Sequence, residues 1–173
     1  MRNLAGYIRN IPDFPVKGIQ FKDITTLLKN GDLLAEAIDY LYDPFRKEEI
    51  DKVVAVEARG FILGAALAYK LNAGFIPIRK PGKLPAEVVR EEYELEYGKD
   101  AIEVHRDAIE VGEKILIVDD LLATGGTASA CCRLIEKLGG EIVGLSFLIE
   151  LTELNGRKNL GHYKVHALME FPF

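Results

Sequence analysis

Residues 114–127 (KILIVDDLLATGGT) constrain the fold of this chain more than any other stretch. The apolar, largely β-branched run 115–118 predicts a buried strand that ends at two adjacent acids, Asp119 and Asp120. A turn of small residues (123–127) follows, and the apolar periodicity beyond it predicts a helix to about residue 138. This order of strand, acidic pair, glycine turn and helix is suited to holding a phosphorylated sugar.

The turn at residues 123–127, called here the phosphate turn, has the features of a site for a phosphate monoester. Gly125 and Gly126 allow consecutive amide groups to turn inward, and a helix that begins here adds the positive end of its dipole. Thr124 and Thr127 add hydroxyl donors. No lysine follows the glycines as in a Walker A loop, and the pattern GxGxxG is absent.

The two adjacent acids strengthen this interpretation. Neighbouring carboxylates at the end of a buried strand repel each other and are costly unless hydroxyls, a cation or a metal meet them. A ribose diol together with Mg²⁺ would meet that need close to a bound phosphate. The alternative is that one aspartate caps the helix and the other is solvated.

The composition predicts one ordinary globular domain. The chain has 173 residues, of which 49% are hydrophobic and 28% charged. A formal net charge of −5 argues against nucleic-acid binding by a basic face. No apolar run approaches the ~18 residues of a membrane span, so no membrane association is expected. Cys131 and Cys132 are neighbours, and no signal-peptide pattern is visible, which favours a reducing, cytoplasmic setting.

The order of strand, turn and helix recurs elsewhere along the chain. Strands are predicted over residues 53–56, 74–78, 141–150 and 165–169, and helices over residues 3–10, 33–42 and 61–71. Their alternation predicts an α/β fold with a mostly parallel, twisted sheet flanked by helices on both faces. Ligands bind beyond the carboxyl ends of such strands, so residues 57–60, 79–83 and 119–127 are expected on one rim. Pro77 suits the start of a strand or an edge strand better than the middle of an inner strand.

Two segments depart from this regular pattern. Residues 11–25 contain two prolines and a glycine, which predict an extended, turning path. Their apolar side chains, among them Phe14 and Phe21, indicate either a loop packed on its own domain or a lid over a ligand. Residues 84–99 are rich in charge, and alternation near their end predicts a mobile hairpin arm paired with residues 101–105.

These residues together resemble a known family. VDDLLATGGT at residues 118–127 is similar to the phosphoribosyl-diphosphate signature of the type I phosphoribosyltransferases. Four further motifs resemble the adenine-specific members in the same order along the chain: IPDFPVKGIQFKDIT, EARGF, IRKPGKLP and LEYGK. The first motif has Ile11 where phenylalanine is expected, which we interpret as a packing change. The resemblance covers nearly the whole chain and implies one phosphoribosyltransferase domain over residues 1–173, with a hood at 1–30 and a flexible catalytic arm at 80–105.

The resemblance implies a pentosyltransferase of purine salvage. Its members transfer the 5-phosphoribosyl group from 5-phosphoribosyl 1-diphosphate to N9 of adenine, with Mg²⁺, and form AMP and diphosphate. They are usually homodimers, so a homodimer is expected. One alternative is the same reaction on xanthine, hypoxanthine or orotate. Another is a regulator that senses the sugar diphosphate without catalysis, which the acidic charge and the intact LEYGK motif disfavour.

The resemblance also implies roles for individual residues. The sugar phosphate would be bound by Asp119, Asp120, Ala123, Thr124, Gly125, Gly126 and Thr127, and the diphosphate by Glu57, Ala58, Arg59, Gly60, Lys80 and Lys83. Asp119 and Asp120 would contact the ribose hydroxyls, and they would contact Mg²⁺ mostly through substrate and water. Adenine would be bound by Gln20, Phe21, Lys22 and Leu121, with Phe21 and Leu121 on opposite faces of the base. The catalytic residues would be Glu96 as acid/base, Arg59 on the leaving group and Tyr97 closing over the diphosphate.

Overall fold

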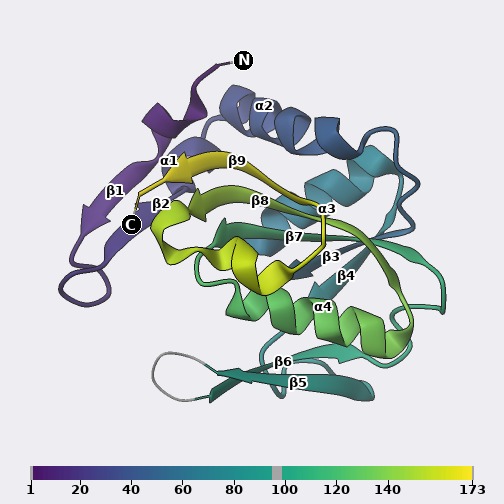
Figure 1. The fold of residues 1–173 in the computed structure, drawn as a ribbon. Coiled ribbons are helices and arrows are strands. Elements are labelled where there is room, and N and C mark those ends of the chain that lie inside the picture. The colour runs from purple at the N-terminus through teal and green to yellow at the C-terminus, as the bar shows by residue number, and fades with distance from the viewer. Residues whose placement is uncertain (1, 95–98, 173) are drawn as a thin grey trace.

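A five-stranded parallel sheet forms the centre of the structure (Figure 1). The computed structural model describes residues 2–94 and 99–172. In spatial order the strands are β4 (Gly74–Ile78), β3 (Lys52–Val56), β7 (Lys114–Leu122), β8 (Glu141–Leu151) and β9 (Val165–Phe171). The predicted α/β fold with a parallel sheet is confirmed. Of the two positions predicted for Pro77, the structure shows the edge strand: Pro77 lies within β4, at the edge of the sheet.

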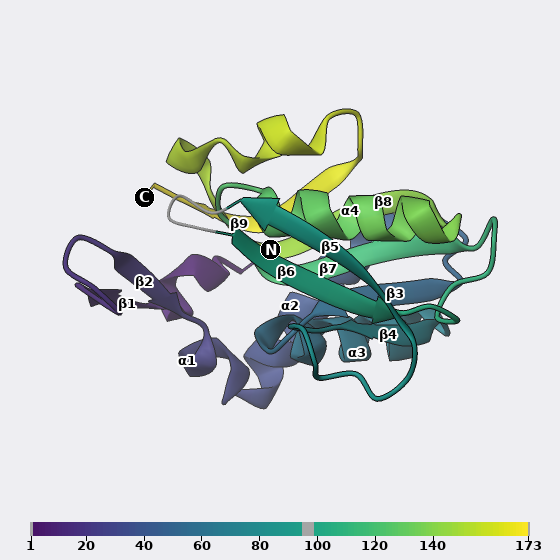
Figure 2. The ribbon, with the colours of Figure 1, turned by 90° about the horizontal axis from the view of Figure 1, so that it is seen from below.

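Layers of helix and hairpin cover both faces of this sheet. The long helices α2 (Gly31–Tyr42) and α3 (Arg59–Leu71) pack on one face. Helix α4 (Gly126–Leu138) and the hairpin of β5 (Val88–Glu94) and β6 (Lys99–His105) cover the other face (Figure 2). Successive side chains of β7 therefore enter two different cores: Ile115 and Ile117 face α4, whereas Leu116 and Val118 face α3.

A second hairpin stands at one end of the molecule. It pairs β1 (Arg9–Pro12) with β2 (Gln20–Asp23) in antiparallel register and is followed by the short helix α1 (Thr25–Leu28). Figure 1 shows this hairpin at the end toward which β8 and β9 point, which is where the carboxyl ends of the parallel strands lie. The remaining elements are the 3-10 turns η1 (Leu4–Tyr7), η2 (Asp43–Phe45), η3 (Thr152–Leu154) and η4 (Gly156–Leu160).

The structure corrects two predicted boundaries. The helix expected over residues 3–10 is only the 3-10 turn η1, because Arg9 and its neighbours pair with β2 as strand β1. Strand β7 does not end before the acids but continues to Leu122, because β8 pairs with it as far as Glu150. Both errors arise because pairing with another strand overrides the local pattern. In the described residues, no helix has the length and apolar character needed to cross a membrane.

Candidate active site

The phosphate turn joins β7 to α4 and leaves the start of α4 open. Gly125 is the residue before the helix and has a φ of +83°, a conformation that favours glycine, and no side chain caps this end. The first α-helical bond runs from the N–H of Ser129 to the carbonyl of Gly125, 2.9 Å away. The backbone N–H groups that precede Ser129 therefore have no hydrogen-bond partner within the helix. Asp119 and residues 121–128 line a cavity at this point.

The two adjacent acids turn to opposite faces of the sheet, since both lie within β7. Asp119 lines the cavity beside the phosphate turn. Asp120 instead faces α3, where its carboxylate lies 2.9 Å from Nε of Arg59. Burial raises the pKa of Asp119 well above its ordinary value, and the charge of Asp120 raises it further. Burial also raises the pKa of Asp120, against the opposing effect of Arg59.

Arg59 connects the acidic pair to the hairpin β1–β2. It is the first residue of α3, and its guanidinium lies over the ring of Phe21, 5.1 Å from the ring centre. Gly60 follows, and a Cβ atom there would lie 2.8 Å from a carboxylate oxygen of Asp119, so α3 begins in close contact with the acids. The peptide bond between Glu57 and Ala58, directly before this helix, is cis.

Glu57 binds the neighbouring rim segment through its side chain. Its carboxylate accepts hydrogen bonds from the backbone N–H of Lys80 and from Nη2 of Arg79, the latter over 3.0 Å. Burial opposes the charge of Glu57, but these donors outweigh burial and hold its pKa below the ordinary value. Through these hydrogen bonds Glu57 connects the loop after β3 with the loop after β4. Lys83, farther along that loop, is exposed.

Lys80 is joined to the phosphate turn by a chain of polar contacts. Its ammonium pairs with the carboxylate of Asp100 and lies 3.3 Å from the hydroxyl of Tyr93. That hydroxyl accepts a hydrogen bond from Thr127 over 3.3 Å. Burial alone would lower the pKa of Lys80, but the bonds to Asp100 and Tyr93 raise it above its usual value. Tyr93 and Asp100 were not predicted from sequence as site residues, and their only signal was the hairpin pattern.

The hairpin β1–β2 presents Phe21 toward the rim. The ring of Phe14 meets that of Phe21 edge to face at 5.1 Å. The side chains of Gln20 and Lys22 both bind Asn10 on the facing strand, at 2.7 Å and 3.0 Å. These side chains are therefore engaged within the hairpin. In the described part of the chain only β1 pairs with β2, so the other edge of β2 carries no strand.

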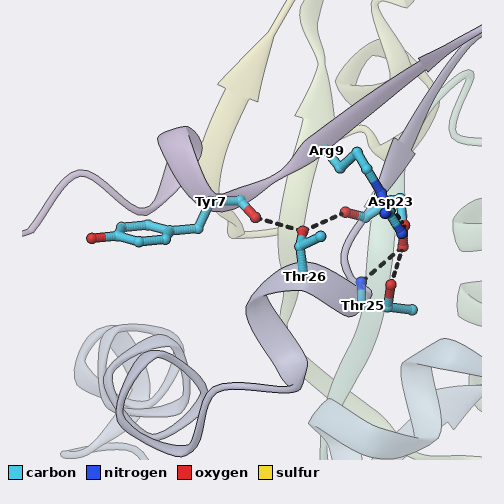
Figure 3. Close-up of polar contacts among 5 residues, drawn as sticks. All are labelled: Tyr7, Arg9, Asp23, Thr25 and Thr26. Carbon is cyan, nitrogen blue, oxygen red and sulfur yellow. Dashed lines mark hydrogen bonds and ion pairs between the residues drawn. The ribbon is translucent and has the colours of Figure 1, made fainter.

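A cluster around Asp23 fixes this hairpin to the rest of the chain (Figure 3). The buried carboxylate of Asp23 accepts bonds from the backbone N–H and hydroxyl of Thr25, at 2.9 Å and 2.7 Å, and from Nε of Arg9 at 2.9 Å. The hydroxyl bond from Thr25 and then the bond from Arg9 lower the pKa of Asp23 to about 2. The hydroxyl of Thr26 donates to the carbonyl of Tyr7 over 2.6 Å.

Two predicted catalytic residues cannot be placed. Glu96 and Tyr97 lie outside the described residues, between the end of β5 and the start of β6. The predicted hairpin itself is confirmed, with Tyr93 opposite Asp100 in its register. Within the described residues, no group of three or more His, Cys, Asp or Glu side chains is arranged to hold a metal ion.

Comparison with known proteins agrees with this geometry. Residues 23–167 match the family model described as "Phosphoribosyl transferase domain". The adenine phosphoribosyltransferase of Thermotoga maritima is 59% identical and that of Chloroflexus aurantiacus 55% identical, each over 98% of both chains. The crystal structure of the adenine phosphoribosyltransferase of Thermoanaerobacter pseudethanolicus has a TM-score of 0.95 and 52% identity, covering 97% of this chain and 98% of its own.

A solved complex adds a more distant relative. The Saccharomyces cerevisiae adenine phosphoribosyltransferase, complexed with adenine and an imino-altritol bisphosphate, has a TM-score of 0.90 and 40% identity. The match covers 95% of this chain and 96% of the yeast chain. On the strength of this fold, this site geometry and these full-length similarities, the chain belongs to the phosphoribosyltransferase family, among the adenine phosphoribosyltransferases.

Proposed function

We propose that this protein transfers the 5-phosphoribosyl group from 5-phosphoribosyl 1-diphosphate to N9 of adenine, with Mg²⁺, and releases AMP and diphosphate. The observation that carries the proposal is the cavity where the open start of α4 and Asp119 lie side by side. Arg59 lies over the ring of Phe21 and pairs with Asp120, the neighbour of Asp119. The names of the relatives and the adenine in the yeast complex support adenine as the base.

The sugar phosphate would occupy the cavity at the phosphate turn. The amides of residues 123–127 and the hydroxyls of Thr124 and Thr127 would bind the 5′-phosphate, because a helix N-terminus favours an anion. Asp119 would accept hydrogen bonds from the ribose hydroxyls. Asp120 would act through Arg59, which it orients between the acids and the hairpin. From sequence we expected both aspartates to contact the ribose hydroxyls; we now propose that contact for Asp119 and an indirect role for Asp120.

Adenine would lie between Phe21 and Leu121. Phe21 offers a ring for stacking, and Leu121 lines the cavity on the sugar side. Because the side chains of Gln20 and Lys22 are engaged with Asn10, the edge of the base would be bound by their backbone groups. A neutral base needs no ionic partner, which suits a pocket of this kind.

The departing diphosphate would be stabilised by positive charge and backbone donors. Lys80, Lys83, Arg59 and the amides of residues 58–60 would surround its oxygens as the bond to C1 breaks, which is stabilisation aimed at the transition state. Glu57 would hold the two loops that carry these groups. Bound Mg²⁺ would add Lewis-acid stabilisation, and the carboxylate of Asp119 with substrate and water oxygens suits its preference for oxygen ligands.

Proton transfer at the base would fall to Glu96. Attack by N9 requires adenine to lose a proton or to start as the tautomer with a free N9 lone pair, and a positioned carboxylate can accept that proton. Tyr97 would close over the diphosphate and help to exclude water. We propose the arm at residues 80–105 and the hood at residues 1–30 as parts of one domain spanning residues 1–173.

We further propose that the protein forms a homodimer in the cytoplasm. On α3, Ile62 is 46% exposed and Tyr69 is 91% exposed, and Phe75 on the edge strand β4 is also exposed. Contact between copies through this face would bury those apolar groups, which extend along α3 from its first turn to its last. Cys131 and Cys132 are both free and buried, which fits a reducing compartment.

One assay tests the reaction and the choice of base. The protein is incubated with Mg²⁺, 5-phosphoribosyl 1-diphosphate and, separately, adenine, hypoxanthine, xanthine or guanine, and diphosphate release is measured. We expect the highest kcat/KM with adenine. Higher values with hypoxanthine or xanthine would overturn the choice of base. Tight binding of the sugar diphosphate without turnover on any base would favour a regulator.

A further inference from the structure

The 3-10 turn η4 (Gly156–Leu160) packs directly against the phosphate turn. A Cβ atom on Gly156 would lie 2.3 Å from the carbonyl oxygen of Ala123, and one on Gly125 would lie 2.4 Å from the carbonyl oxygen of Gly156. The two backbones are therefore in contact with no space for a side chain between them. Gly156 is buried, and neither of these contacts is visible in the sequence motif of the phosphate turn.

Asn159 adds a hydrogen bond across the same contact. Its Nδ2 donates to the carbonyl oxygen of Thr124 over 2.7 Å. In a trans peptide group the C=O and N–H bonds point in opposite directions. The bond from Asn159 therefore sets the plane of the Thr124–Gly125 peptide and directs the N–H of Gly125 away from Asn159. The orientation of an amide in the phosphate turn thus depends on a residue 35 positions later in the chain.

The turn η4 is itself firmly attached to the sheet. Nε of Arg157 donates to both carboxylate oxygens of Glu150, at 2.9 Å and 2.8 Å, and Nη1 donates to the carbonyl of Val165 at 2.8 Å. Glu150 is 5% exposed, and Leu160 at the end of η4 is 2% exposed. These contacts join η4 to β8 and β9, so η4 can serve as a fixed support.

We propose that Gly156 and Asn159 are positioning residues that hold the phosphate turn in the geometry that binds the 5′-phosphate of the substrate. This inference rests on the proposed function. Neither residue is placed in contact with substrate, and both act through the backbone of residues 123–125. Their loss should weaken binding of every ligand that carries the 5′-phosphate. It should leave the recognition of adenine, which depends on the hairpin β1–β2, almost unchanged.

Two variants with matched controls test whether Gly156 and Asn159 position the phosphate turn. Asn159→Asp keeps the size of the side chain but places an acceptor against the carbonyl of Thr124, and Gly156→Ala inserts a methyl group into the backbone contact. Asn155→Asp adds the same charge in the same loop, where Asn155 donates to the carbonyl of Glu153 over 2.9 Å. Gly31→Ala adds a methyl group where no atom lies within 4 Å.

The measurements are the Kd of ribose 5-phosphate by calorimetry and the KM of each substrate. We expect Asn159→Asp to raise the Kd of ribose 5-phosphate and the KM of the sugar diphosphate by about fivefold, in line with the loss of one hydrogen bond. Gly156→Ala should have a larger effect, because the backbone must move. The KM of adenine should change less than about twofold, and both controls should behave like the wild type.

The outcomes separate this inference from the proposed function. If Asn159→Asp binds ribose 5-phosphate as well as the wild type does, and the wild type forms AMP, the positioning role is wrong but the proposed function is not. Equal increases in the KM of both substrates would also overturn the positioning role, since a general structural defect predicts that result. A wild-type protein that forms no AMP would contradict the proposed function itself. Should Gly156→Ala fail to fold, Asn159→Asp decides the question.

Discussion

At the scale of single residues, Asp119 and Asp120 show how neighbours of the same type acquire different roles. The strand continues through both, so their side chains leave on opposite faces of the sheet. Arg59 compensates the charge of Asp120, whereas Asp119 lines the cavity. Burial raises the pKa of Asp119 and the charge of Asp120 raises it further, although the backbone N–H of Asp120 donates to the Asp119 carboxylate over 2.8 Å. Because Asp119 lines the cavity, we expect it to be the carboxylate that a bound sugar would contact.

Glu96 provides a test of proton transfer at the residue scale. We expect Glu96→Gln to lower kcat at least about tenfold with little change in the affinity for the sugar diphosphate, because the amide cannot accept the N9 proton. Steady-state AMP formation measures this effect. Glu92→Gln is a suitable control, since Glu92 is an exposed residue of the same hairpin that binds Arg90 over 3.3 Å. Near-wild-type turnover of Glu96→Gln would exclude the acid/base role.

At the scale of elements, the two hairpins are anchored differently. The described strands of β5–β6 are fixed to α4, since Glu91 binds Nε of Arg133 at 2.5 Å and also pairs with Lys137. The flexibility proposed for residues 80–105 stays a prediction. The hairpin β1–β2 has no strand from the central sheet beside it, and the Asp23 cluster connects it to η1 and α1 (Figure 3). The Asp23 cluster thus contributes to the position of Phe21, together with the contact of Arg59 with the Phe21 ring.

The Asp23 cluster predicts a pH-dependent contribution to stability. The pKa of Asp23 is lowered from 3.8 to about 2 in the folded protein. A lowered pKa means that the contribution is complete above pH ~4 and is lost as the pH falls from about 4 to 2. We expect Asp23→Asn to reduce the free energy of unfolding by about 1–2 kcal/mol at neutral pH, the scale of one charge-assisted hydrogen bond.

Urea unfolding at several pH values measures this contribution. The difference between wild type and Asp23→Asn should be constant between pH 7 and 5 and should shrink below pH 4. The same variant should raise the KM of adenine more than that of the sugar diphosphate, because Phe21 lies two residues from Asp23 on the same strand. A difference in stability that persists unchanged at pH 2 would show that the charge of Asp23 is not its source.

At the scale of the whole molecule, the apolar face of α3 predicts self-association. Ile62 and Tyr69 are seven residues apart, so they lie on the same face of the helix. We expect Ile62→Glu together with Tyr69→Glu to convert a dimer to a monomer in sedimentation velocity, because charges would be buried at the contact. Val111→Glu is the control, as Val111 is 87% exposed and lies beside Gly139 at the end of α4, which covers the other face of the sheet. A monomeric wild type at micromolar concentration would contradict the dimer.

Much of the architecture could be predicted from sequence because it is encoded locally. The apolar runs of β3, β4, β7 and β8 and the helical periodicity of α2, α3 and α4 appear within single stretches of chain, and the structure confirms them. The phosphate turn could be predicted for the same reason, since strand, acids, glycines and helix are contiguous. Pro77 limited its position to a strand start or an edge strand, and the structure shows the edge.

Some contacts between separate segments of the chain are visible only in the tertiary structure. The pairing of β1 with β2, the extension of β7 past the acids and the division between Asp119 and Asp120 all follow from strand pairing and register. The approach of η4 to the phosphate turn joins residues more than 30 positions apart. No local pattern records such contacts, because strand order and close packing bring them together only when the whole chain has folded.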